Sequence, residues 1–336
     1  MNTDPLNILR VIEPALAYRK SLLDENSLAA LRLFNGFTEG YPDLLVDLYA
    51  RTLVIYDYAG SSLSVQDWQF LWEWYRREIP WIDAVLLKPR VTEDLGARRG
   101  RLVYGGPPAN RILENGVWYA VNLGLNQDAS LYLDTRLLRA WLFAHADGKD
   151  VLNTFAYTGS LGIAAAAGGA RKVVNSDLNP RFLDLARQSA RLNQIPEKRY
   201  RLQTGDFFSQ VSSLKRSSAR FDIVISDPPF FSSTAKGQVN LVGQSRRVIN
   251  KLRPLVRDGG CLVSINNALF VSGADYLKEL NELCADGYLN LEELLPVPQD
   301  FIGGAGSAAA WPAASASSTA TSAASRTTRS TSGSRR

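Results

Sequence analysis

The stretch of sequence that decides the fold is Val151-Leu152-Asn153-Thr154-Phe155-Ala156-Tyr157-Thr158-Gly159-Ser160-Leu161-Gly162. Its apolar start predicts a strand, its middle a turn, and the part from Ser160 the beginning of a helix. Gly159 allows the backbone to approach a ligand closely, and Gly162 allows the helix to pack against the strand. Such a turn is typical of nucleotide-binding sheets, although a tight turn without a ligand has the same pattern.

Strands and helices alternate on both sides of this stretch. Downstream of Asp134, helical patterns separate six strand-like segments, at residues 150–155, 172–177, 200–204, 221–226, 260–265 and 291–296. This order predicts an α/β fold with a parallel sheet covered on both faces, which binds ligands beyond the carboxyl ends of its strands. Residues 32–107 instead show short strands, turns and one helix, which predict a small α+β domain before the sheet.

Acidic residues stand at the ends of the second and third of these strands. Asp177, 18 residues after Gly159, can accept hydrogen bonds from both hydroxyls of a ribose. Asp206, just after the third strand, can accept a hydrogen bond from an adenine amino group. Each could be an ordinary exposed acid, but acids at successive strand ends together favour a nucleoside site.

The segment Ser226-Asp227-Pro228-Pro229-Phe230-Phe231 follows the fourth strand. Two successive prolines fix the backbone and lack donors, so the neighbouring carbonyls and the Asp227 carboxylate can accept hydrogen bonds from a substrate amino group. An aromatic ring beside them can stack on a flat base. We therefore predict a substrate-binding loop here, whereas the plainer alternative is a rigid turn with packed phenylalanines.

Together these motifs resemble those of the class I S-adenosylmethionine-dependent methyltransferases. More narrowly, they resemble bacterial 23S ribosomal RNA methyltransferases of the cytosine-C5 and guanine-N7 type. Residues 126–136, from Asn126 to Arg136, are similar to that group's lead-in to the cofactor domain, and Arg32 to Tyr49 resembles its small RNA-facing domain. The resemblance covers residues 30–302 and implies a Rossmann-like sheet, S-adenosylmethionine as cofactor, and RNA as partner, with ribosomal RNA as the expected substrate. The PUA module that many relatives carry has no counterpart.

The resemblance also implies which residues form the site. It assigns contacts with the cofactor to Tyr132, Asp134, Arg136, Asn153, Phe155, Tyr157, Gly159, Asp177, Leu178, Asp206, Phe207 and Asp227. It assigns the chemistry and the substrate to Asp227, Pro228, Pro229, Phe230, Phe231 and Asn267.

The end of the fifth strand bears on the atom that is methylated. Methylation of cytosine C5 requires a cysteine thiolate that first adds to the ring, and the cytosine-type relatives place this cysteine at the end of the fifth strand. Here the segment is Ser264-Ile265-Asn266-Asn267, with asparagine at that place, while Cys261 stands at the strand's start. The pattern resembles the guanine-N7 relatives, so we expect methylation of a base nitrogen, with cytosine C5 as the alternative.

The C-terminal sequence departs from the family. From Gly303 onward the composition falls to Ala, Ser, Thr, Gly and Arg, which predicts a disordered tail. Relatives have a seventh, antiparallel strand here, so we expect this strand to be lost and edges of the sheet to be unpaired. The predicted organisation is a leader (1–30), a small α+β domain (31–125), a cofactor-binding methyltransferase domain (126–302) and a tail (303–336).

Composition excludes several classes of protein. No apolar run reaches 18 residues and no signal peptide is visible, so we expect a cytoplasmic protein without a membrane span. Two cysteines and one histidine, His145, indicate no metal site. The net charge is +5, but four arginines and no acid lie in the last 36 residues, which leaves 5 − 4 = +1 elsewhere. Charge alone therefore does not predict binding of RNA.

Other functions stay open. A dinucleotide-dependent oxidoreductase shares the strand–turn–helix pattern but gives no reason for the Asp-Pro-Pro-Phe segment. A non-catalytic RNA-binding protein is possible if the altered C-terminus has cost the activity. The sequence does not predict an oligomeric state.

Overall fold

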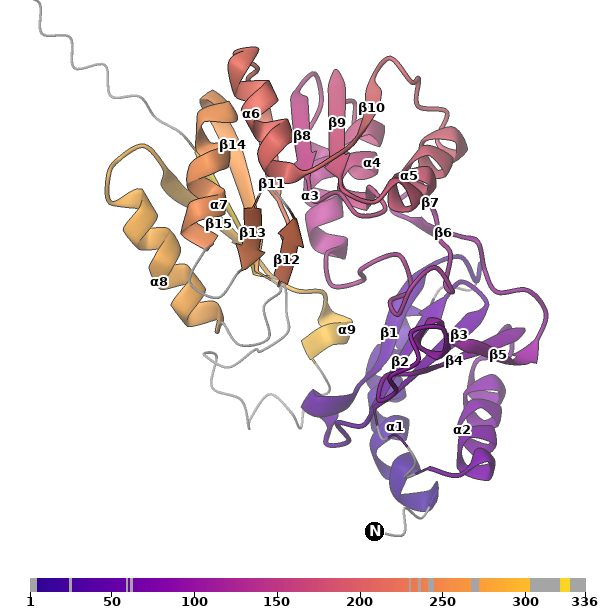
Figure 1. The fold of residues 1–336 in the computed structure, drawn as a ribbon. Coiled ribbons are helices and arrows are strands. Elements are labelled where there is room, and N and C mark those ends of the chain that lie inside the picture. Colours follow the sequence, from indigo (N-terminus) through magenta and orange to yellow (C-terminus); the bar gives the residue numbers. More distant parts are fainter. Residues whose placement is uncertain are drawn as a thin grey trace, which may run out of the picture. The chain divides into compact units, whose positions relative to one another are not determined.

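The computed structural model describes residues 5–23, 26–58, 60, 63–229, 231–234, 237–240, 245–266, 272–302 and 321–326. The chain forms two compact units. The first consists of Met1–Leu133 with Pro298–Trp311, and the second of Asp134–Val297 with Pro312–Arg336. Figure 1 colours both units along the sequence.

The first unit is built on a five-stranded sheet in the order β1-β2-β3-β4-β5, in which only β3 and β4 are parallel. The helix between these two strands begins with a capping box, in which Ser64 and Asp67 satisfy each other's backbone N–H groups. Its elements are β1 (Ala30–Asn35), β2 (Leu44–Tyr49), β3 (Thr52–Asp57), β4 (Ala84–Pro89), β5 (Arg101–Gly105), the hairpin β6 (Arg111–Glu114) and β7 (Val117–Ala120), α1 (Pro5–Arg19), α2 (Val65–Glu78), α9 (Gln299–Ile302), and the 3-10 turns η1 (Lys20–Leu22), η2 (Gly36–Glu39) and η3 (Ala97–Arg99).

The segment expected to be a leader belongs to the core of this unit. Ile8, Ile12 and Leu16 of α1 are buried in one cluster with residues of the sheet and of α2. The buried Arg19 guanidinium, at the end of α1, pairs with Glu39 at 2.7 Å and donates to the backbone carbonyl of Asp300 at 2.7 Å. Helix α1 is therefore structural, which corrects the prediction of a leader for these residues.

The second unit is built on a seven-stranded sheet in the order β10-β9-β8-β11-β14-β16-β15. Strands β8 to β11 and β14 pair in parallel, and the chain order reverses between β8 and β11. The predicted α/β fold with a Rossmann-like sheet is thereby confirmed. Its elements are β8 (Asp150–Thr154), β9 (Lys172–Asp177), β10 (Tyr200–Thr204), β11 (Phe221–Ser226), β12 (Phe231–Thr234), β13 (Gly237–Asn240), β14 (Val256–Asn266), β15 (Asn290–Leu295), β16 (Thr321–Arg326), α3 (Arg136–His145), α4 (Ser160–Ala167), α5 (Pro180–Leu192), α6 (Phe207–Arg216), α7 (Ser245–Leu252), α8 (Gly273–Cys284) and the 3-10 turn η4 (Arg253–Leu255).

Helices cover both faces of this sheet. Figure 1 shows α6, α7 and α8 on one side and α3, α4 and α5 on the other. The first three helices share one apolar cluster, to which Val211, Ile249 and Leu280 contribute together with the strand residues Val224 and Leu262. This two-sided cover leaves the carboxyl ends of β8 and β11, where the strand order reverses, as the place for a ligand.

The prediction of a lost seventh strand is wrong. Thr321–Arg326 forms β16, which pairs antiparallel with both β14 and β15; Ala324, for example, lies opposite Val263 on one side and Glu293 on the other. Small residues bury little apolar surface, but a strand inside a sheet also satisfies the backbone groups of two neighbours, and this requirement does not depend on composition. The rest of the predicted tail, residues 303–320 and 327–336, lies outside the described residues.

Candidate active site

The turn after β8 has an unusual backbone. Phe155, Tyr157 and Gly159 have φ values of +54°, +50° and +75°. The left-handed region is uncommon for residues with a side chain, and such strain is found preferentially at functional sites. Nothing in the sequence marks Phe155 and Tyr157 for this conformation, so sequence reasoning found the turn but not its shape.

The two glycines of the turn both serve close packing. A Cβ at Gly162 would lie 2.0 Å from Oδ1 of Asn175, which confirms that helix α4 requires glycine to pack against β9. A Cβ at Gly159 would lie 2.6 Å from the Cβ of Ala186 in α5. The backbone at Gly159 therefore approaches helix α5 closely. Gly159 has a packing role there, in addition to any role toward a ligand.

The side chains of the turn divide into buried and accessible ones. Asn153 is only 1% exposed, and its Nδ2 donates to Oδ1 of Asn175 at 3.0 Å, so this predicted cofactor contact lies beneath the turn. Oδ1 of Asn153 has no hydrogen-bond partner within the described part of the chain. Phe155 is half-buried and stacks on Phe207, with ring centroids 4.5 Å apart.

Asp177 is held by the backbone at the end of β9. Its Oδ2 accepts from the N–H of Tyr157 and its Oδ1 from the N–H of Asn179, each at 2.8 Å. Burial raises the pKa of this carboxyl, and these backbone donors oppose that rise. An ionised carboxylate has about four acceptor sites, so the geometry is compatible with further donors such as ribose hydroxyls. Leu178 beside it is 55% exposed, an apolar surface next to the carboxylate.

Asp206 begins helix α6. Its Oδ1 accepts from the backbone N–H of Ser209 at 3.0 Å, so Asp206 is the N-cap of α6, a role that the sequence-based interpretation missed. The cap places Phe207 at the first position of the helix, where it meets Phe155. The residue that follows β8 and the first residue of α6 therefore form one aromatic surface.

Asp227 follows β11, the strand that pairs with β8. Burial, and in second place the negative charge of Asp134, raise the pKa of Asp227 to about 7. Pro228 is buried and Pro229 half-buried. The structure thus brings Asp134 and Asp227, far apart in the sequence, within electrostatic reach of each other.

The remaining predicted site residues are less closely defined. Tyr132, in the first unit, is 43% exposed and donates to Asp128 at 3.2 Å; Arg136 is the half-buried first residue of α3. Phe231 is the first residue of β12. Phe230 and Asn267 lie outside the described residues.

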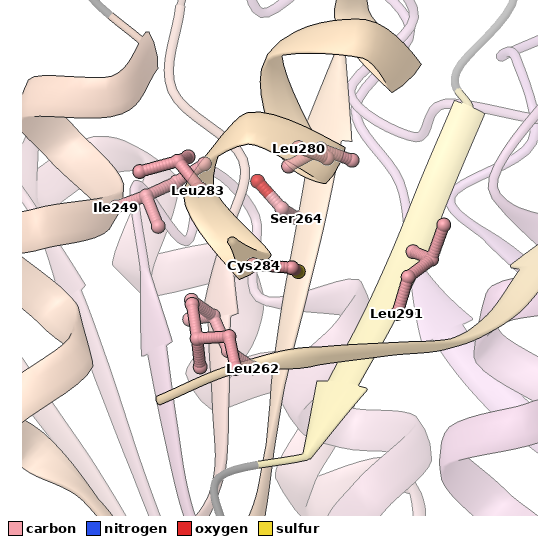
Figure 2. Close-up of a pocket in the computed structure, with 8 residues that line it drawn as sticks. Ile249, Leu262, Ser264, Leu280, Leu283, Cys284 and Leu291 are labelled. Carbon is pink, nitrogen blue, oxygen red and sulfur yellow. The ribbon is translucent and has the colours of Figure 1, made fainter. Parts of the chain in front are cut away.

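Neither cysteine lies at the end of β14. Cys261 precedes the last residue of that strand, Asn266, by five positions, or about 17 Å at ~3.3 Å per residue. Figure 2 shows Cys284 and Ser264 lining a cavity between α8, β14 and β15. Its volume of about 10 Å³ is on the scale of one water molecule, and burial raises the pKa of the Cys284 thiol. This cavity is too small for a cofactor, and burial disfavours the thiolate form of Cys284.

The groups at the carboxyl ends of β8, β9, β10 and β11 fit S-adenosylmethionine in their chemistry. Carboxylates suit the ribose hydroxyls and the amino groups, and the stacked Phe155–Phe207 pair is an aromatic surface of the kind that suits an adenine ring. Within the described ranges, no three His, Cys, Asp or Glu residues are placed to hold a metal ion. No described helix is both long and apolar enough to cross a membrane.

Comparisons with known proteins place the chain among methyltransferases. The family model of S-adenosylmethionine-dependent methyltransferases matches residues 102–310. Ribosomal RNA large subunit methyltransferase I of Alteromonas mediterranea is 30% identical over 77% of this chain, and that of Aeromonas hydrophila 32% over 76%. In both cases the match spans 65% of the relative's own length.

A solved structure shares the fold. The candidate methyltransferase SMU.776, in a complex with SAH, superposes with a TM-score of 0.84 at 22% identity, over 97% of this chain and 82% of that one.

Proposed function

This chain belongs to the family of S-adenosylmethionine-dependent methyltransferases, and from that premise we propose that it methylates a base nitrogen of ribosomal RNA. The observation that carries the proposal is the Asp227-Pro228-Pro229 segment at the carboxyl end of β11, beside the strained turn of β8. Relatives named for the large ribosomal subunit support RNA as the substrate. The small first unit is proposed to face this RNA.

The cofactor is proposed to lie along the ends of β8, β9 and β10. Asp177 accepts from the ribose hydroxyls, while its existing backbone hydrogen bonds keep the carboxylate fixed. Asp206 accepts from the adenine amino group, and the Phe155–Phe207 pair covers the ring. The other residues assigned from the family resemblance, Tyr132, Asp134, Arg136, Asn153, Tyr157, Gly159 and Leu178, are proposed to line or support this site. When bound, the cofactor supplies an activated methyl group on a sulfonium, which departs as a neutral thioether.

Asp227 is proposed to orient the target base and to take up its proton. A carboxyl with a pKa of about 7 accepts a proton readily near neutral pH, which suits a group that receives the proton lost when an amino nitrogen of the base is methylated. Methylation of a ring nitrogen without a hydrogen, such as guanine N7, releases no proton, and Asp227 would then only orient the base. Pro228 and Pro229 keep the neighbouring backbone carbonyls free as acceptors. Phe230 and Phe231 are proposed to stack on the base, and Asn267 to hold its edge.

Cytosine C5 is the second candidate for the methylated atom, and the cysteines count against it. Cys261 stands five positions before the end of β14, and Cys284 lines a small cavity in which burial raises the pKa of the thiol. A nitrogen nucleophile attacks the methyl group with its own lone pair and needs no thiolate. The reading as an inactive RNA-binding protein rested on a damaged C-terminus, and β16 removes that motive.

The proposal is tested in two steps. Calorimetry with the full chain should detect binding of S-adenosylhomocysteine and no binding of NAD. Mass spectrometry of ribosomal RNA from a strain that lacks the gene should then reveal one unmethylated base, which the purified protein methylates again. Binding of NAD, or ribosomal RNA identical in both strains, would refute the proposal.

A further inference from the structure

Helices α6 and α7 carry a concentration of positive charge. Their sequences, Phe207–Arg216 and Ser245–Leu252, contain Lys215, Arg216, Arg246, Arg247 and Lys251 and no acidic residue. Figure 1 shows the two helices on the same side of the sheet. The remainder of residues 1–300 must therefore carry a net negative charge, since the sum over these residues is only +1.

Two of these residues, Arg247 and Lys251, lie near one aromatic ring, and Lys215 is close to Lys251. The guanidinium of Arg247 and the Nζ of Lys251 each lie 5.5 Å from the ring centroid of the half-buried Phe208. Burial, followed by the charge of Lys251, lowers the pKa of Lys215, so Lys215 and Lys251 are close enough to repel each other. We name Lys215, Arg247 and Lys251, with Phe208, the α6–α7 cation cluster.

Among the residues that the structure describes, the cluster has no acidic partner, unlike the neighbouring cations. Arg246 and Arg253 pair with Glu282 and Asp286 at 2.5 and 2.7 Å. Neither Lys215, Arg247 nor Lys251 forms an ion pair with any residue that the structure describes. Like charges held together cost stability, so an uncompensated group of this kind is suited to an external anion.

We propose that the α6–α7 cation cluster binds the phosphate backbone of the substrate RNA outside the methylated nucleotide. The inference rests on the proposed function and adds a second contact surface to it. Both helices begin next to parts of the proposed site: α6 follows Asp206, and α7 follows the β12–β13 hairpin after the Asp227 loop. Contacts with phosphates fix the register of a nucleic acid without reading its bases, which is what a nucleotide-specific methyl transfer needs from a distal surface.

The test is the double variant Arg247→Gln/Lys251→Gln in the full chain, with Arg187→Gln/Arg191→Gln on α5 as a control of equal charge change. Binding of ribosomal RNA is measured by filter retention over a series of salt concentrations. We expect the RNA dissociation constant of the first variant to rise about tenfold, and the slope of log affinity against log salt to fall by roughly 0.7–0.9 per lost phosphate contact. The control should keep the wild-type slope, and affinity for S-adenosylhomocysteine should be unchanged in both.

The possible failures are distinguishable. If the wild type methylates RNA but the double variant binds it with unchanged affinity and slope, the cluster serves another anion, such as an acidic protein, and the inference fails alone. If the control variant loses as much RNA affinity as the first variant, the effect comes from net charge and the inference is refuted. If the first variant also loses S-adenosylhomocysteine binding, the effect comes from damaged folding, and the inference is again not supported. If the wild type neither binds nor methylates RNA, the proposed function fails as well.

Discussion

The environment of Asp227 favours the protonated carboxyl, whereas its proposed role requires the ionised form. Its pKa of about 7 means that burial and Asp134 keep the carboxyl largely protonated in acid, whereas a proton acceptor must be ionised. The single-turnover rate of methylation should therefore rise as the pH passes through about 7 and level off above it. Asp227→Asn should lower the rate by about 10²–10⁴-fold and leave cofactor affinity within a few fold. A rate that does not change with pH would exclude this carboxyl as the acceptor.

The same pKa predicts a dependence of stability on pH. The folded-state pKa lies above the value of about 3.9 in an unfolded chain. The protonated carboxyl therefore contributes stability that is fully present below about pH 4 and is lost as the pH rises through about 7. Asp227→Asn should match the wild type in thermal unfolding in acid and exceed it at alkaline pH. Equal melting temperatures at alkaline pH would contradict this.

Asp177 should matter to both binding and local order. Asp177→Ala removes the proposed ribose contact and also the acceptor for the N–H groups of Tyr157 and Asn179. Loss of a hydrogen bond to a charged group costs about 1.5–3 kcal/mol, so calorimetry should show the affinity for S-adenosylhomocysteine falling about tenfold or more. Asp184→Ala, an exposed acid on α5, is the matched control. Unchanged affinity in Asp177→Ala would remove this residue from the site.

The cysteines allow a test of the methylated atom. The double variant Cys261→Ala/Cys284→Ala should keep its activity, with a cost in stability of about 1–3 kcal/mol because Cys284 lines a cavity. RNA that contains 5-fluorocytosine traps enzymes that add a thiolate to the ring, so no denaturant-resistant complex should form with the wild type. A covalent adduct that disappears in the double variant would make cytosine C5 the better assignment.

At the scale of elements, what the sequence predicts depends on how strongly each element is specified locally. The alternation of strand and helix patterns is visible in short windows of sequence, and it predicts the parallel sheet. Gly162 and the Asp-Pro-Pro segment are local signals as well, and they predict the turns at the ends of β8 and β11. Helix α1 also has a local signal that the prediction of a leader overlooked, since Ile8, Ile12 and Leu16 recur on one helical face. The left-handed Phe155 and the proximity of Asp134 to Asp227 could not be predicted, because tertiary packing determines both.

Strand β16 is the clearest case of an element specified by its neighbours. It lies between β14 and β15, so each of its backbone groups has a partner available on one side or the other. Ala324→Pro removes one N–H from this interior strand and leaves a carbonyl without its donor, so it should lower the stability by about 1–3 kcal/mol, whereas Ala324→Val keeps the N–H and should not. Thermal unfolding of the two variants makes the comparison. An equal melting temperature for Ala324→Pro would show that residues 321–326 do not pair in the sheet.

At the scale of the whole molecule, the first unit depends on residues from the far end of the chain. Asp300 is fully buried; its carboxylate accepts from the N–H of Arg32 at 2.9 Å and its carbonyl from Arg19. Asp300→Ala should cost about 1–3 kcal/mol in urea unfolding because it removes the acceptor of the part-buried Arg32 N–H. Glu78→Ala, an exposed position in the same unit, should stay within about 0.5 kcal/mol. Equal effects of the two changes would mean that the C-terminal segment does not stabilise the first unit.

The first unit is discontinuous in the sequence, because it consists of residues 1–133 and 298–311. This discontinuity limits how recombination can exchange the unit between relatives. Recombination with a relative at one point near residue 133 would join Arg19 and Arg32 to a foreign residue at the position of Asp300. Only an exchange at two points transplants the unit with its own partners. The two units are therefore expected to pass through evolution as one cassette, and chimeras with a single junction should fold poorly unless both parents share the Arg19–Asp300 contact.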